Sequence, residues 1–295
     1  MKKPKTPSSF EKFWEILTDD PDRFSKLLQA STGPTVNGKY LHWDELLRRT
    51  PPDGFKHEEW WFALKLNRNQ LYKSIPLKDQ NGDSFKYAEV EPIPERLHVP
   101  AQVAGGRIHM PDEITNPETR DRYYVSSLIE EAINSSQLEG ASTTRNVAKD
   151  MLRSGRDPRD KDERMILNNF ITMRRIGELR KERLTKDLIF EVHRLVTAGT
   201  LDNEDEAGRF RIKTDGEIIV ANKMDEIFYI PPPCEQLHER MQAMCAFANG
   251  ETPSNFVNPV IRSIILHFWL SYDHAFTDGN GRTARALFYW SMLHH

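Results

Sequence analysis

Apolar residues recur three and four positions apart through most of the second half of this chain. That spacing places them on one face of a helix. A different pattern interrupts it at Ile218–Val220 and Ile227–Ile230, two β-branched and aromatic runs separated by polar residues, which predict a β-hairpin. Helices are predicted over residues 122–139, 146–152, 162–179, 186–197, 235–248 and 259–272.

The first half of the chain is less regular. Helical spacing predicts helices within residues 8–30, 40–49 and 56–68, which share a small aromatic core. Six prolines between residues 74 and 117 interrupt any long helix, so that stretch is predicted to be irregular. The core residues expected in this half are Trp60, Trp61, Leu64 and Leu71.

Together these elements predict an all-α architecture. Its main domain, over residues 111–295, is a helical bundle that carries the β-hairpin and includes the helix near residues 122–140. A small, mostly helical module with an irregular linker precedes it over residues 1–110.

Composition narrows the class of protein. The 295 residues are 38% hydrophobic and 29% charged, as in a folded globular chain, and the net charge of -3 gives no basic field for nucleic acid or acidic lipid. Two cysteines, Cys234 and Cys245, are too few for a disulfide scaffold or a zinc site. No apolar stretch is long enough for a secretion signal or a membrane span, so the expected location is cytoplasmic.

The segment from His274 to Arg285 is dense in chemically active residues. Three known nucleotide- or metal-binding motifs do not match this segment. Gly279, Gly281 and Ala284 fit the spacing of a dinucleotide fingerprint, but a helix precedes them where that motif needs a strand. A calcium loop lacks its required glycine and final glutamate, and a P-loop lacks its Gly-Lys-Ser/Thr.

The physical interpretation of this segment is an anion site. Gly279 and Gly281 allow a tight turn between two helices and close approach of a ligand. The free N–H groups and dipole of the second helix favour a phosphate there. Arg282 and Arg285 lie three apart on that helix, and each can bind phosphate oxygens.

Two further side chains supply chemistry beside the anion site. Asp278 is a hard oxygen ligand suited to a magnesium ion that bridges phosphates, and His274 can take a proton from a hydroxyl near neutral pH. Each of these residues also has an ordinary structural explanation when it is considered by itself. A histidine that ends a helix, for example, is more often a packed residue than a catalytic one. The conjunction of the segment's residues predicts phosphoryl or nucleotidyl transfer.

The same segment resembles the Fic family, whose motif is H-x-F-x-D/E-G-N-G-R-x-x-R. Residues 274–285 match every fixed position, with Ala275 where many members have proline. Ser135-Ser-Gln-Leu-Glu139-Gly140 resembles the S/T-x-x-x-E-G/N helix of autoinhibited members, and Gly208–Arg211 resembles the stretch before the family's flap. The resemblance covers about residues 111–295 and implies a Fic-type bundle whose hairpin is the flap.

The resemblance implies a protein adenylyltransferase. ATP lies over Gly279, Asn280 and Gly281, and Asp278 holds Mg²⁺ between its phosphates. His274 deprotonates a Tyr, Ser or Thr hydroxyl of a target protein or of the chain itself. That oxygen attacks the α-phosphorus, while Asn280 and the backbone amides stabilise charge.

The resemblance also implies that the helix near residues 122–140 inhibits the enzyme. The carboxylate of Glu139 competes with the γ-phosphate for Arg285, with Arg282 as a second contact, and Ser135 steadies the pair. An ordinary exposed glutamate before a helix-ending glycine is the structural alternative.

Other functions remain open from the sequence. The same site could remove AMP from a modified target or use another nucleotide donor, or the chain could be a non-catalytic nucleotide-binding regulator. Family members usually continue through further helices, often to a winged helix-turn-helix, whereas this chain stops ten residues past Arg285. A truncated chain with His294 and His295 as tag remnants is therefore expected, and nucleic-acid binding is expected only of a missing C-terminal module. A homodimer is left open.

Overall fold

The computed structural model describes residues 5–9, 14, 20–30, 33–52, 54–104, 117–216, 218–221 and 227–295. It divides into two compact units. The N-terminal unit comprises Met1–Ser74 and Lys86–His109, and the bundle unit comprises Ile75–Phe85 and Met110–His295. Each is considered by itself. The domain boundary predicted at residue 110 lies outside the described residues.

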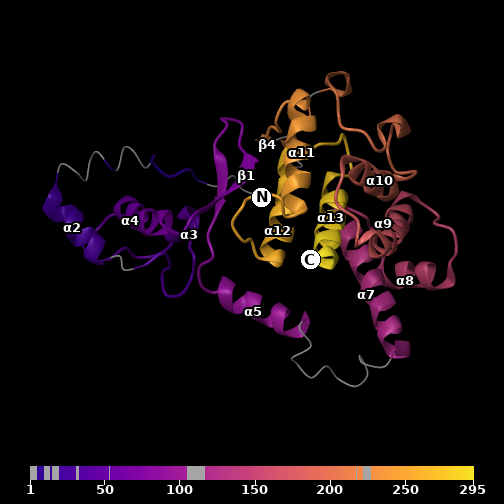
Figure 1. Ribbon diagram of the computed structural model, residues 1–295, viewed down its shortest axis with the longest axis horizontal. Coiled ribbons are helices and arrows are strands. Elements are labelled where there is room, and N and C mark those ends of the chain that lie inside the picture. Colours follow the sequence, from indigo (N-terminus) through magenta and orange to yellow (C-terminus); the bar gives the residue numbers. More distant parts are fainter. Residues whose placement is uncertain are drawn as a thin grey trace. The chain divides into compact units, whose positions relative to one another are not determined.

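The bundle unit is helical, as the periodicity predicts (Figure 1). The fold class predicted from sequence is confirmed. The helices are α7 (Pro117–Leu138), α8 (Arg145–Ser154), α9 (Lys161–Leu179), α10 (Lys186–Thr197), α11 (Leu237–Ala248), α12 (Pro259–Asp273) and α13 (Asn280–His294). The last helix, α13, packs against four others, α7, α9, α10 and α12, and Figure 1 shows it between α12 and α9.

Side-chain caps mark where several of these helices begin. The Asp160 carboxylate accepts the Glu163 N–H at 2.8 Å before α9, and the Thr185 hydroxyl accepts the Leu188 N–H at 3.2 Å before α10. Each cap satisfies one amide that has no partner within its helix. These short polar residues therefore determine where the helices start.

The core of the bundle unit lies between α12, α13 and their neighbours. Trp269 on α12 and Trp290 on α13 are each about 1% exposed, and Phe276 in the turn between those helices is fully buried. Large aromatic side chains bury the most apolar area per residue, so they contribute strongly to the free energy of folding. The motif-bearing turn is thus anchored directly in the core.

The N-terminal unit has its own small core. Leu41, Trp43 and Leu46 pack with Trp60 and Leu64 of the following helix, as the predicted aromatic cluster requires. The predicted core residue Leu71 is 38% exposed, because the helix has ended before it. The helices of this unit are α2 (Pro21–Ala30), α3 (Trp43–Leu46), α4 (His57–Asn69) and α5 (Ile93–Ala104); most of the predicted helix before Asp20 lies outside the described residues.

The prediction that the chain is irregular after residue 74 is wrong in part. Strands β1 (Lys73–Lys78) and β2 (Ser84–Tyr87) pair as a hairpin, followed by helix α5. Pro76 lies within β1, which among the described residues has one partner strand, and edge strands are where proline is tolerated in a sheet. Pro94 lies in the first turn of α5, where the N–H has no helical partner anyway.

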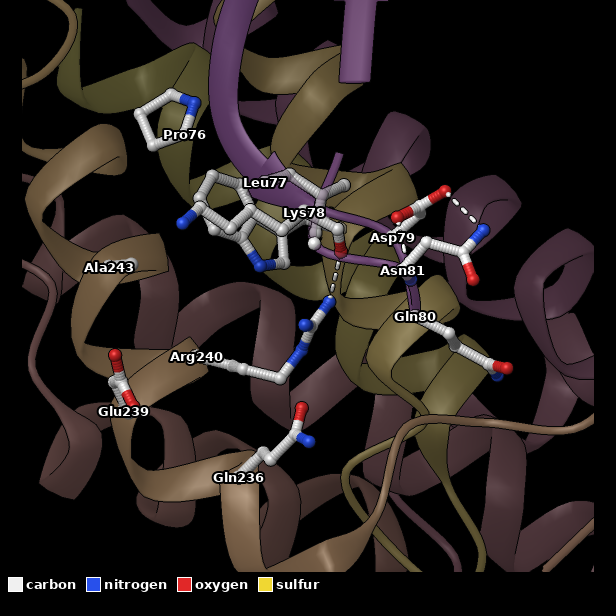
Figure 2. Close-up of a pocket in the computed structure, with 12 residues that line it drawn as sticks. Pro76, Leu77, Lys78, Asp79, Gln80, Asn81, Gln236, Glu239, Arg240 and Ala243 are labelled. Carbon is white, nitrogen blue, oxygen red and sulfur yellow. Dashed lines mark hydrogen bonds between the residues drawn. The ribbon is translucent and has the colours of Figure 1, made fainter. Parts of the chain in front are cut away.

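The tip of this hairpin, Ile75–Phe85, belongs to the bundle unit, and within that unit it lies against α11 (Figure 2). Arg240 of α11 donates to the carbonyl of Lys78 at 2.6 Å, and Phe85 stacks edge-on against Tyr272 of α12 with ring centroids 4.9 Å apart. A cavity of about 370 Å³ lies between the tip and α11, with Leu77 and Trp269 among its lining residues.

A second small hairpin follows α10. Strands β3 (Val220–Ala221) and β4 (Ile227–Tyr229) pair antiparallel, as the two β-rich runs predict. The connecting residues 222–226 lie outside the described part. Within the described residues, no helix combines the length and the apolar character that crossing a membrane requires.

Candidate active site

The turn that carries the motif begins with an unusual backbone conformation. His274 ends α12 in the left-handed region, with φ 46° and ψ 56°. A non-glycine residue there is strained unless its surroundings hold it. Arg211 provides that support, because its Nε donates to the His274 carbonyl at 2.8 Å and its backbone N–H donates to Ala275 at 2.9 Å.

The Asn280 side chain closes the same turn. Its Oδ1 accepts the Phe276 N–H at 2.9 Å and its Nδ2 donates to the Phe276 carbonyl at 2.8 Å. The side chain is 4% exposed, and both of its polar atoms are satisfied internally. Asn280 therefore shapes the turn, and the free donors toward a ligand are the backbone amides that begin α13.

Gly279 allows the turn to lie close to α10. Its φ is 78°, in the region that favours glycine, and a Cβ there would come within 2.5 Å of Thr197. The Asp278 carboxylate accepts the Gly279 N–H at 2.5 Å. Helix α13 then starts with its first N–H groups facing the turn, as an anion site requires.

The predicted partner of Arg285 lies in contact with it. The Arg285 guanidinium donates to Glu139 Oε1 at 2.6 Å, to Ser135 Oγ at 2.7 Å and to the Ser135 carbonyl at 3.1 Å. Glu139 follows the end of α7, and its carboxylate lies over the start of α13. A Cβ added to Gly281 would approach Glu139 Oε1 to 2.2 Å. The carboxylate thus occupies the helix-start position that favours an anion.

Arg282 is directed elsewhere. Its guanidinium is 3% exposed and donates to the Val196 carbonyl at 2.9 Å and the Thr200 hydroxyl at 3.2 Å. Its Nη2 lies 3.3 Å from Asp278 Oδ2. The structure therefore brings Arg285, and not Arg282, against the Glu139 carboxylate, and it places Arg282 as a link between α13 and α10.

Asp278 is suited to bind a metal together with a nucleotide. Its carboxylate is 57% exposed at the rim of the turn. The described residues contain no cluster of three or more histidine, cysteine or acidic side chains that could hold a metal by themselves. A single carboxylate fits Mg²⁺, which commonly binds through one or two carboxylates and the phosphates of its substrate.

The imidazole of His274 is in a state suited to a base. Burial lowers the pKa of His274 below its usual value, although a backbone hydrogen bond to Ser271 and the charges of Glu139 and Asp278 oppose that effect. Arg211 also lowers this pKa. The ring is therefore neutral at pH 7 and able to accept a proton.

The sequence analysis missed His193, a buried histidine beside the motif. His193 on α10 is fully buried and stacks on Phe276, with ring centroids 3.7 Å apart. Burial lowers the pKa of His193 to about 4. No motif identifies this residue, because its partners are backbone groups far away in the chain.

A buried ion pair directly precedes His274 in the chain, and the sequence analysis missed it as well. Asp273 is fully buried, and it accepts from Arg240 Nε at 2.7 Å and from Trp269 Nε1 at 3.1 Å. Burial raises the pKa of Asp273 to about 6, against the opposing effect of Arg240. The pair connects α11 to the end of α12, where His274 begins the turn.

Comparison with known proteins defines the class of this domain. Residues 183–292 match the Fic/DOC family. A signaling protein with a Fic domain from Bacteroides thetaiotaomicron superposes with a TM-score of 0.54 at 23% identity, covering 61% of this chain and 67% of that one. Fic-1 from Caenorhabditis elegans superposes with a TM-score of 0.51 at 21% identity, covering 68% of this chain and 56% of that one. Residues 183–292 therefore resemble the Fic/DOC family in sequence, and the helical fold is similar to that of Fic structures.

Two curated relatives of this chain are named protein adenylyltransferases. The chain is 34% identical over 108 residues to the protein adenylyltransferase Fic of Nematostella vectensis, covering 37% of this chain and 22% of the relative. It is 28% identical over 176 residues to the protein adenylyltransferase fic-1 of Caenorhabditis elegans, covering 59% of this chain and 32% of the relative. The chain thus spans about a fifth to a third of the length of these relatives.

Proposed function

We propose that this protein transfers AMP from ATP to a hydroxyl group of a protein. The observation that carries the proposal is the convergence of three groups on one turn: the half-buried imidazole of His274 with its lowered pKa, the exposed carboxylate of Asp278 and the anion-binding start of α13. The adenylyltransferase names of the relatives favour AMP transfer over other phosphate chemistry.

The chain's residues act in defined ways in this reaction. The backbone amides of Gly281 and its neighbours bind phosphate oxygens at the start of α13. Asp278 would hold Mg²⁺, which would supply positive charge to offset that of the phosphates. His274 takes the proton of a Tyr, Ser or Thr hydroxyl, whose oxygen then forms a bond to the α-phosphorus. The bond from the α-phosphorus to the bridging oxygen breaks, and pyrophosphate leaves.

Glu139 inhibits this reaction in the proposed mechanism. Its carboxylate pairs with Arg285 at 2.6 Å and lies on Gly281, so it excludes a phosphate from both partners. A charge-assisted hydrogen bond contributes about 1.5–3 kcal/mol, equivalent to roughly ten- to a hundred-fold in nucleotide binding. The side chains are 18% and 32% exposed, which favours the lower part of that range.

Transfer of label from α-labelled ATP with Mg²⁺ tests the proposal. Glu139→Gly and Glu139→Gln should raise the rate of self- or target labelling by about ten-fold or more, because Arg285 becomes free for phosphate. His274→Ala in either background should abolish labelling. Glu131→Gln, an exposed glutamate on α7 outside this contact, is the matched control and should leave the rate unchanged.

Equal labelling by all variants, including His274→Ala, would refute AMP transfer by this turn. Loss of AMP from a modified protein with the wild-type chain, and its absence with Glu139→Gly, would instead assign AMP removal to the site. Binding of ATP without turnover in every variant would assign a regulatory role.

A further inference from the structure

Among the described residues, the fully buried side chain of His193 hydrogen-bonds to two loops of the site. One loop carries Asp278, the proposed metal ligand, and the other begins at Gly208 and leads to Arg211, which supports His274. Its Nε2 lies 2.9 Å from the main-chain carbonyl oxygen of Asp278, and its Nδ1 lies 2.9 Å from the backbone N of Gly208. The ring is 0% exposed. Both ring nitrogens are therefore shielded from bulk solvent.

These two partners determine the tautomer. The Gly208 N–H can only donate, so Nδ1 must be the unprotonated nitrogen and accept. The Asp278 carbonyl can only accept, so Nε2 carries the proton and donates. The ring cannot rotate away, because it stacks on Phe276 at an interplanar angle of 11° and 3.7 Å between centroids.

The bond to Asp278 restrains a residue that has few other restraints. The Asp278 side chain is 57% exposed, and its carboxylate contacts only Gly279 and Arg282 among the described residues. Its main-chain carbonyl is held by the buried imidazole of His193 at 2.9 Å. Rotation of that peptide group would displace the Asp278 carboxylate. A metal-binding carboxylate that moves by about 1 Å loses much of its contribution to metal binding.

The bond to Gly208 extends the same restraint toward the base. Gly208 has φ +72°, and the segment it begins leads to Arg211. Arg211 in turn holds the His274 carbonyl at 2.8 Å. One rigid ring therefore connects the two loops that carry Asp278 and support His274.

We propose that His193 is a positioning residue, whose Nε2–H bond to the Asp278 carbonyl sets the geometry with which the Asp278 carboxylate binds a divalent metal and nucleotide. This inference rests on the proposed function for its ligand, a metal-bound nucleoside triphosphate. Loss of such supporting partners commonly weakens metal binding by about 10- to 100-fold.

Three substitutions separate the two hydrogen bonds. His193→Gln places an amide N–H where Nε2 lies and keeps the bond to Asp278. His193→Asn places an oxygen where Nδ1 lies and keeps the bond to Gly208 alone. His193→Phe keeps the ring and its stacking on Phe276 but neither bond. Each is made in the full chain with Glu139→Gly and His274→Ala, which frees the site and prevents turnover.

Mn²⁺ binding in the presence of a non-hydrolysable ATP analogue is measured by electron paramagnetic resonance. His193→Gln should bind within about twofold of its parent, and His193→Asn and His193→Phe should bind about tenfold more weakly. Circular dichroism melting establishes that each variant is folded. If His193→Phe does not fold, the Gln and Asn pair decides the outcome, because each keeps one bond.

Equal Mn²⁺ affinity in all variants would overturn the inference, and so would equal weakening in His193→Gln and His193→Asn, which would indicate a merely structural ring. Absence of nucleotide-dependent Mn²⁺ binding in the parent would overturn it as well. Because no transfer step is measured, a chain that binds Mn²⁺ and nucleotide but never transfers AMP would refute the proposed function alone.

Discussion

The His274 backbone shows what a single residue contributes to this site. A left-handed histidine at the end of α12 turns the chain so that the imidazole and the following motif residues share one loop. Arg211 holds that conformation from outside the motif. The geometry of the motif residues thus depends on side chains from other segments of the chain.

The lowered pKa of His274 predicts the pH profile of the reaction. Burial favours the neutral ring, so the base stays unprotonated below its ordinary value of about 6.5. The kcat/KM of the Glu139→Gly variant should be constant through pH 7 and decrease only when the pH falls below about 6.5. An acid limb that begins above pH 7 would contradict the neutral base.

The contact between Gly281 and the Glu139 carboxylate predicts where a phosphate oxygen of the nucleotide would lie. The φ of Gly281 is ordinary, so alanine is tolerated by the backbone, but a Cβ would approach Glu139 Oε1 to 2.2 Å. If a phosphate takes the place of this carboxylate, Gly281→Ala in the Glu139→Gly background should raise the Kd for a non-hydrolysable ATP analogue by about tenfold or more. Isothermal titration with the ATP analogue checks this. Unchanged affinity would place the phosphate elsewhere.

At the scale of elements, helix starts were predictable and strand pairing after residue 74 was not. Asp160 and Thr185 are short polar residues directly before apolar-periodic runs, which is the pattern of a helix start. The pair β1–β2 contains Pro76 and has no strong alternation, so local sequence argued against a strand. Cross-strand pairing and the packing of its tip on α11 and α12 stabilise it instead.

The caps give a prediction about stability. Asp160→Ala should lower the free energy of unfolding by about 1 kcal/mol, because the Glu163 N–H loses its acceptor. Thr144→Ala is the matched control, since Thr144 occupies the same position before α8 without a side-chain cap bond. Urea unfolding measures both. Equal losses in the two variants would show that the cap bond contributes nothing.

Across the whole molecule, one buried ion pair links the hairpin tip, α11 and the end of α12. Arg240 donates to the Lys78 carbonyl at 2.6 Å and to Asp273 at 2.7 Å, one residue before His274. These partners lie far apart in the chain. Their convergence could only be seen in the folded structure, because nothing in the spacing of Arg240 and Asp273 pairs them.

The ion pair predicts an asymmetric double-mutant cycle. Arg240→Ala leaves a buried, unpaired carboxylate and should lower the free energy of unfolding at pH 8 by about 3 kcal/mol. The loss should be smaller at pH 5, because Asp273 has a raised pKa and can take a proton there. Arg240→Ala with Asp273→Asn should be more stable than Arg240→Ala alone, since no charge remains buried. Additive losses would contradict this account.

The sequence by itself determined the helical class of the bundle, the hairpin after α10 and the twelve-residue motif, because periodicity, turn residues and contiguous chemistry are local properties. The resemblance of residues 135–140 to the inhibitory helix of the Fic family also pointed to Glu139. Only the tertiary structure decided which arginine meets Glu139, that Asn280 shapes the turn, and that His193, Arg211 and Asp273 surround it. Those facts depend on segments distant in sequence that pack together, and hydrogen bonds to backbone groups leave no pattern of residue types from which they could be predicted.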